Sequence, residues 1–154
     1  MIIKKNNFLI SEEFQLVKKN NIKISERPLI TSSYDSYKIL MASWNMGCIS
    51  FTESFKVILL NKANRVLGIK EISSGGMTAC IADPKIIFMT ALASGACGIV
   101  LAHNHPSGNL NPSKADLDIT EKLKNGGQLL DIAVLDHIIV THVNFYSFAD
   151  EGLM

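Results

Sequence analysis

The spacing of apolar and polar residues changes several times along the first half of the chain, and each spacing predicts an element. Apolar side chains in residues 37–44 recur at helical spacing, which predicts an amphipathic helix. Residues 55–60 (FKVILL) are mostly apolar and predict a strand buried on both faces. Residues 65–72 follow a polar turn and predict the hairpin partner of that strand. Residues 77–82 indicate a third strand.

In the second half of the chain, predicted helices and strands alternate. Residues 83–95 predict a helix, because an aspartate N-cap is followed by proline and a glycine closes the segment. Residues 98–102 (GIVLA) are wholly apolar and predict a strand in the centre of a sheet. Residues 113–127 predict a second helix, with the glycine pair at positions 126 and 127 as its stop. Strands are expected over residues 134–140 and 145–148.

This order of elements predicts the fold class and the domain organisation. Strands and helices alternate around one sheet that contains an early antiparallel hairpin, so we expect a mixed α/β or α+β sandwich. A chain of 154 residues suits one domain with a real core. We interpret residues 1–32 as an irregular N-terminal leader and residues 33–154 as the domain.

The composition excludes several classes of protein. With 47% hydrophobic and 19% charged residues, the chain is neither a disordered tail nor a coiled coil. Fifteen Lys and Arg residues against fourteen Asp and Glu give a net charge of +1, so no strong basic field supports a nucleic-acid partner or binding to an anionic membrane.

Targeting and redox signals point to the cytoplasm. Residues 86–102 are uncharged, but the stretch is short for a membrane span and contains glycines, so a buried helix leading into a buried strand explains it better. The N-terminus lacks the pattern of a signal peptide. Cys48, Cys80 and Cys97 form no C-x-x-C pair, and we expect them to be reduced thiols in the core.

Residues 102–116 (AHNHPSGNLNPSKAD) hold the strongest chemical signal. His103 and His105 leave the predicted central strand at i and i+2, so both imidazoles can point to the same side. A loop restricted by two prolines then leads to a helix that carries Asp116 in its first turn. Two imidazoles and one carboxylate are ligands that a catalytic zinc uses, with the fourth position left for water.

The pair Ser113 and Asp116 also has a purely structural interpretation. Ser-x-x-Asp at the start of a helix is a capping box, with Asp in place of the more usual Glu. The histidines have a weaker structural alternative, because two imidazoles leaving an apolar strand are costly to bury without a partner.

A hydrolytic zinc site also needs a general base that is not a ligand, and a donor for the developing oxyanion. Glu53, just ahead of the strand over residues 55–60, and Glu71 on the hairpin are nearly equal candidates for the base on the pattern alone. Ser113 can supply a hydroxyl donor. The adjacent Asp136 and His137 are either partners that orient a ligand imidazole or a buried hydrogen-bonded pair.

Taken together, Glu53, His103-x-His105, Ser113 and Asp116 resemble the JAMM motif of the JAB/MPN metalloproteases. The fuller string H-N-H-P-S-G-x-x-x-P-S-x-x-D resembles the RadC-type branch, bacterial proteins historically labelled as DNA repair proteins. The strings FKVILLNKANRVLG, VLDHIIV and YSFADEG extend the likeness over roughly residues 30–154.

The resemblance implies a cytidine-deaminase-like α/β/α sandwich of the JAB/MPN type and one Zn²⁺ held by His103, His105 and Asp116. It also implies that Glu53, rather than Glu71, activates the zinc-held water that attacks an amide carbonyl, and that Ser113 stabilises the tetrahedral intermediate. The expected partner is a peptide or protein substrate, cut at a peptide or isopeptide bond. The first 30 residues are too short for the helix-hairpin-helix region that RadC-type proteins often carry, which suggests a short form of the family.

Two other functions compete with this hypothesis. A DNA-repair-associated binding module with a structural or vestigial metal site is the main alternative, and the near-neutral charge argues against it. A nucleobase deaminase would need H-x-E followed by P-C-x-x-C, whereas this chain has H-N-H and no cysteine pair.

Overall fold

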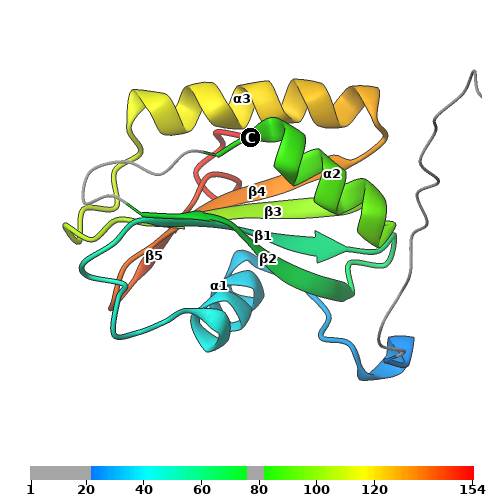
Figure 1. The fold of residues 1–154 in the computed structure, drawn as a ribbon, viewed down its shortest axis with the longest axis horizontal. Helices are drawn as coiled ribbons and strands as arrows, with labels where there is room; N and C mark the ends of the chain where they lie inside the picture. Colours follow the sequence, from blue (N-terminus) through cyan, green and yellow to red (C-terminus); the bar gives the residue numbers. More distant parts are fainter. Residues whose placement is uncertain (1–21, 76–81) are drawn as a thin grey trace, which may run out of the picture.

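The computed structural model describes residues 22–75 and 82–154, and within them it places five strands in one mixed sheet. The order across the sheet is β2-β1-β3-β4-β5 (Figure 1). The strands are β1 (Ser54–Leu60), β2 (Val66–Ser74), β3 (Gly98–Asn104), β4 (Ala133–Val140) and β5 (Phe145–Ser147). The expected strand over residues 77–82 lies outside the described residues except for Ala82, which is not in a strand.

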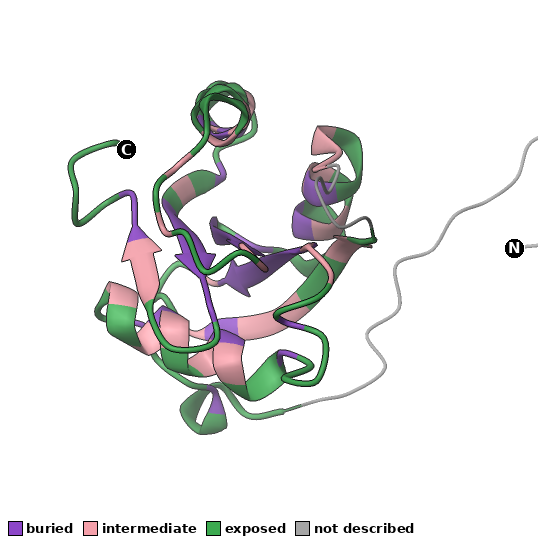
Figure 2. Ribbon diagram, turned by 90° about the vertical axis from the view of Figure 1, so that its left-hand side faces the viewer, coloured by how far each residue is buried: buried purple, intermediate pink, exposed green. Residues whose placement is uncertain are grey.

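Helices cover both faces of the sheet, which makes a three-layer α/β/α sandwich as expected. Helix α1 (Ser33–Ser43) lies on one face, and α2 (Pro84–Ser94) and α3 (Lys114–Leu129) lie side by side on the other (Figures 1 and 2). A short 3₁₀ helix, η1 (Ile24–Glu26), precedes α1. No helix in the described part of the chain is long and apolar enough to span a bilayer.

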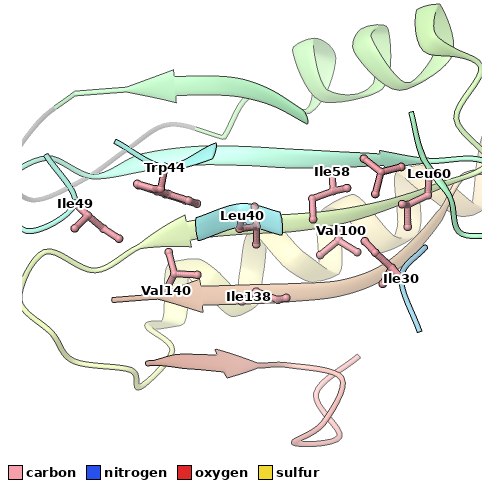
Figure 3. Close-up of a cluster of buried hydrophobic side chains, with 11 residues drawn as sticks. Ile30, Leu40, Trp44, Ile49, Ile58, Leu60, Val100, Ile138 and Val140 are labelled. Carbon is pink, nitrogen blue, oxygen red and sulfur yellow. The ribbon is translucent and has the colours of Figure 1, made fainter. Parts of the chain in front are cut away.

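Each face of the sheet has its own hydrophobic core, because alternate side chains of a strand point to opposite faces. Leu40 and Trp44 from the α1 side pack on Ile58, Val100 and Ile138 in the first core (Figure 3). The second core lies beneath α2 and α3. Its buried members are Phe55, Val57, Leu59, Ile87, Ala91, Ala96, Ile99, Leu101, Leu123 and Ile132.

Strand β3 lies in the middle of the sheet and positions the functional residues. It is antiparallel to β1 and parallel to β4, and all seven of its residues are buried. This confirms the prediction of a central apolar strand over residues 98–102. The strand extends to Asn104, so the backbone is still paired with its neighbours when it reaches His103.

The segment just ahead of α1 is attached to this domain. The Arg27 guanidinium is buried and donates hydrogen bonds to the carbonyl oxygens of Val66 and Leu67, at 3.1 and 2.9 Å. Ile30 belongs to the first core. Residues 1–21 of the expected leader lie outside the described residues.

Two predictions about local structure were wrong. Cys48 and Cys97 are free thiols, but both are exposed rather than in the core; Cys80 lies outside the described residues. Helix α3 does not stop at the glycine pair and continues to Leu129. Close packing explains these glycines, since a Cβ at Gly126 would lie 2.9 Å from the Phe88 ring, and one at Gly127 would collide with the carbonyl oxygen of Ile132.

Replacing Gly127 with alanine is therefore expected to destabilise the protein by about 2 kcal/mol, in the range of an overpacked core. In a helix interior alanine is ordinarily more favourable than glycine by roughly 0.5–1 kcal/mol. A decrease in the free energy of unfolding on Gly127→Ala would therefore indicate the collision. Urea unfolding measures the free energy. Gly126→Ala is the matched control, because it meets only a side chain that can turn, and should lose less. A Gly127→Ala protein as stable as the control would contradict this packing.

Candidate metal centre

His103 and His105 occupy the C-terminal end of the central strand. His103 pairs with Phe55 of β1 on one side and Ile139 of β4 on the other, and its side chain is 2% exposed. His105 lies just past the strand, but its N–H still donates to the carbonyl oxygen of Val140 at 3.0 Å. The extended backbone therefore continues through His105, and the i, i+2 spacing brings both imidazoles to the face of the sheet that carries α3.

The start of helix α3 brings Asp116 to the histidines. Ser113 is the N-cap, and its hydroxyl accepts a hydrogen bond from Asp116 N–H at 3.2 Å. The Asp116 carboxylate accepts from Ser113 N–H and from the Ser113 hydroxyl, each at 2.7 Å. The predicted capping box is thus present in full, and the same carboxylate faces the imidazoles.

Ligand atoms of His103, His105 and Asp116 all lie within 4.8 Å of one another, so the three residues can hold a metal ion. The two imidazole Nε2 atoms are 2.9 Å apart. The Asp116 carboxylate oxygens lie 3.1 Å from Nε2 of His103 and 3.6 Å from Nε2 of His105. Each separation is below twice the ordinary Zn–N distance of about 2.0–2.1 Å, so one ion can contact all three.

The partners of the other imidazole nitrogens support this fit. His105 Nδ1 donates to the carbonyl oxygen of Asn109 at 2.6 Å, and a carbonyl only accepts, so this nitrogen carries the proton. His103 Nδ1 is likewise engaged, 2.8 Å from Nε2 of His137. The two remaining Nε2 atoms face each other and a carboxylate. At these distances a cation or a proton is required between them.

The electrostatics of the three residues are those of a cation site. Burial raises the pKa of Asp116, but the adjoining imidazoles of His103 and His105 and the Ser113 hydroxyl outweigh it and hold that pKa well below its usual range. Hydrogen bonding to Asp116 raises the pKa of His105, with a smaller contribution from the charge of Glu53. The carboxylate is therefore ionised and attracts a positive charge.

Glu53 is outside the group of three candidate ligands, but its charge acts on one of them. It precedes β1 and is half-buried, and its charge acts on His105. Asn104, which is fully buried and lies between His103 and His105 in the sequence, fixes the backbone on both sides of Glu53. The Asn104 amide accepts from Ser54 N–H at 2.7 Å and donates to the Thr52 carbonyl at 2.8 Å.

Glu71, the other candidate base, faces the opposite side of the sheet. Its carboxylate is 3.6 Å from Lys56 Nζ, and the Lys56 ammonium lies over the Trp44 ring on the α1 face. Phe55, the neighbour of Lys56, points to the other face and stacks on His103. The sheet therefore separates Glu71 from the candidate metal ligands.

The adjacent residues Asp136 and His137 have different surroundings, which the sequence could not show. Asp136 accepts from the Ser147 hydroxyl at 2.7 Å and from Ala149 N–H at 3.0 Å, and burial raises its pKa. The His137 ring instead contacts His103 and, at 2.6 Å, the Thr120 hydroxyl. Burial, together with the neighbouring His103, lowers the pKa of His137 well below its usual value. Thr120 carried no sequence signal of its own.

Comparisons with known proteins agree with this geometry. A family model described as the RadC-like JAB domain matches residues 30–153. A "UPF0758 protein" of Flavobacterium johnsoniae is 44% identical over 124 residues, which cover 80% of this chain and 53% of that protein. Another, from Desulfitobacterium hafniense, is 38% identical over 128 residues, or 83% of this chain and 55% of that protein.

The α/β/α sandwich and the placement of the three candidate ligands define a domain of the JAB/MPN type. The family match spans nearly the whole described domain, and the chain belongs to the RadC-like JAB domain family. The chain spans about half the length of the curated relatives it matches.

Proposed function

We propose that this chain is a zinc-dependent hydrolase that cuts peptide or isopeptide bonds in a peptide or protein substrate. The observation that carries the proposal is the convergence of ligand atoms of His103, His105 and Asp116 within 4.8 Å, where the charge of a further carboxylate, Glu53, also acts. Two histidines and one carboxylate leave a fourth position open, as in catalytic rather than structural zinc sites.

Zinc held by these residues would supply a Lewis acid and a water whose pKa is lowered toward about 7. In that chemistry Glu53 would be the general base, accepting a proton from the attacking water and passing it to the leaving amine. A general base of this kind contributes roughly 10²–10⁴-fold to the rate. The hydrogen bonds of Asn104 to Thr52 and Ser54 restrain the backbone on both sides of this carboxylate.

Ser113 donates its hydroxyl to the oxyanion that develops on the substrate carbonyl. In this structure the hydroxyl is exposed and donates to Asp116, so a rotation about one side-chain bond redirects it. The N-terminal end of α3 also presents its positive dipole end to the site, which favours the ionised form of Asp116.

Removing and restoring the metal tests the proposal. We expect the zinc-loaded full chain to cleave members of a library of peptides and isopeptide-linked dipeptides, with products identified by mass spectrometry. Chelation should abolish these cleavages, and one equivalent of zinc should restore the same products. Cleavage that continues in metal-free protein, or a zinc-saturated protein that cleaves no amide in the library, would contradict the proposed activity.

A further inference from the structure

A chain of three short hydrogen bonds connects the backbone of α3 to His103. The Thr120 hydroxyl lies 2.5 Å from the carbonyl oxygen of Asp116 and 2.6 Å from Nδ1 of His137. Nε2 of His137 lies 2.8 Å from Nδ1 of His103. Thr120 is 2% exposed and His137 is fully buried, so the chain is shielded from bulk water.

The contact between Thr120 and Asp116 fixes the direction of the first hydrogen bond. Two oxygen atoms 2.5 Å apart need a proton between them, and the Asp116 carbonyl can only accept. The Thr120 hydroxyl has one proton, which it therefore gives to Asp116. Its oxygen is left to accept, so Nδ1 of His137 carries the proton in the second hydrogen bond.

The tautomer of His137 in turn determines which nitrogen of His103 carries the proton. His137 is fully buried, and no carboxylate of a described residue forms a hydrogen bond or ion pair with its ring, so the neutral form with one proton is favoured. With that proton on Nδ1, Nε2 of His137 has a lone pair and accepts from Nδ1–H of His103. The lone pair of His103 is consequently on Nε2, the atom that faces His105 and Asp116.

We propose that Thr120 and His137 are positioning residues that hold His103 in its Nδ1–H tautomer and so aim its Nε2 lone pair at the metal. The inference rests on the proposed metal role of His103. Asp116 takes part at both ends of this arrangement, since its carbonyl oxygen accepts from Thr120 and its carboxylate faces Nε2 of His103. Two of the three candidate ligands are thereby fixed relative to each other by the same buried chain.

The opposite direction of hydrogen-bond donation would prevent His103 from binding a metal, so the direction can be tested. If Thr120 gave its proton to His137 Nδ1, then His137 would donate from Nε2 to His103 Nδ1. His103 would carry its proton on Nε2 and present no lone pair to the metal. Thr120→Val keeps the shape of the side chain but removes the hydroxyl. We expect that His103 is then no longer held in the Nδ1–H form, because the buried Nδ1–H of His137 has lost its acceptor.

The test records two-bond ¹H–¹⁵N spectra of the metal-free full chain labelled at histidine over a range of pH, and each tautomer is read where the spectra show one proton on that imidazole. We expect both His103 and His137 in the Nδ1–H form. In Thr120→Val we expect His103 to move toward the Nε2–H form, and in Thr120→Ser to stay as in the wild type. An Nε2–H tautomer of His103 or His137 in the wild type would overturn the proposal.

Zinc affinity gives the second readout. Losing an outer partner of a ligating histidine costs about 10–100-fold in metal affinity, and we expect a loss of this size in Thr120→Val but not in Thr120→Ser. Thr90→Val is the matched control, because Thr90 makes the same hydrogen bond to the carbonyl four residues earlier, at 2.8 Å to Ile86, away from any histidine. Equal affinities of Thr120→Val and Thr90→Val would overturn the proposal.

The two readouts separate this inference from the proposed hydrolysis. The tautomers are measured without metal or substrate, and the affinities without substrate. A chain that binds zinc through this network but cuts no amide would contradict the hydrolase and leave the positioning role standing. An active hydrolase in which His103 is in the Nε2–H form before metal binding would contradict the positioning role and leave the proposed hydrolysis standing.

Discussion

Glu53→Gln is expected to lower the rate of amide hydrolysis by at least about 100-fold while the protein still binds one zinc per chain. Glutamine has the shape of glutamate but cannot accept the proton of the attacking water. The Glu53 charge also acts on His105, so its removal should lower the pKa of that imidazole, and zinc should then compete with a proton slightly more easily. Single-turnover cleavage and metal content, measured on the same sample, separate the two effects.

Glu71→Gln is the matched control for this prediction. Glu71 lies across the sheet beside Lys56, and its side chain is 49% exposed, so its loss should leave the rate within about twofold, as expected of a surface substitution away from the site. Cleavage that survives in Glu53→Gln would remove Glu53 as the base. An equal loss in both variants would show that the carboxylate acts through the stability of the sheet and not through proton transfer.

If His103 is a direct ligand as proposed, His103→Ala is expected to lower zinc affinity by more than the roughly 10–100-fold that the loss of an outer partner causes. Since His103 is buried, its loss also leaves a cavity and takes the donor away from His137. His105→Ala removes a more exposed ligand with less structural damage and should cause a similar loss of affinity. Competition with a fluorescent zinc chelator measures the affinities.

His142→Ala provides the matched histidine control. His142 is exposed in the turn after β4, outside the group that can hold a metal, and its replacement should leave zinc affinity unchanged. Circular dichroism and a urea titration on all three variants show whether each is folded. A folded His105→Ala protein with wild-type affinity would contradict the assignment of the metal site to this cluster.

Local patterns were enough to predict the core of the candidate site. An apolar run ending in His103-x-His105 predicts a strand that carries two imidazoles to one side, and the strand is observed. Ser-x-x-Asp predicts a helix start, and the capping box is present. Both signals involve residues close in sequence, where the spacing alone decides which way the side chains point.

Residues that meet through strand pairing could not be placed in the same way. Glu53 and Glu71 were nearly equal on the pattern, because only the pairing of β1 with β2 and β3 decides which face each carboxylate occupies. The contact of His137 with His103 depends on the parallel register of β3 and β4, which shifts between Ile99 and Val100. Spacing within one strand carries no information about such a shift.

The end of α3 was also predicted wrongly from local sequence alone. Glycine often ends a helix because it adopts positive φ easily, and this local rule predicted a stop at positions 126 and 127. The observed reason for glycine is distant in space: the Phe88 ring of α2 and the carbonyl of Ile132 approach the helix too closely for a Cβ. A rule about backbone freedom therefore gave the wrong result where packing determined the residue.

Anomalous diffraction at the zinc absorption edge, from crystals of the full chain grown with zinc, tests the central claim most directly. We expect one strong peak in direct contact with His103 Nε2, His105 Nε2 and the Asp116 carboxylate, at the ordinary Zn–N distance of about 2.0–2.1 Å from the imidazoles. Glu53 should face the ion from outside the ligand set. A peak held by other residues, or no peak at this cluster in zinc-saturated crystals, would contradict the metal centre and the hydrolase proposed on it.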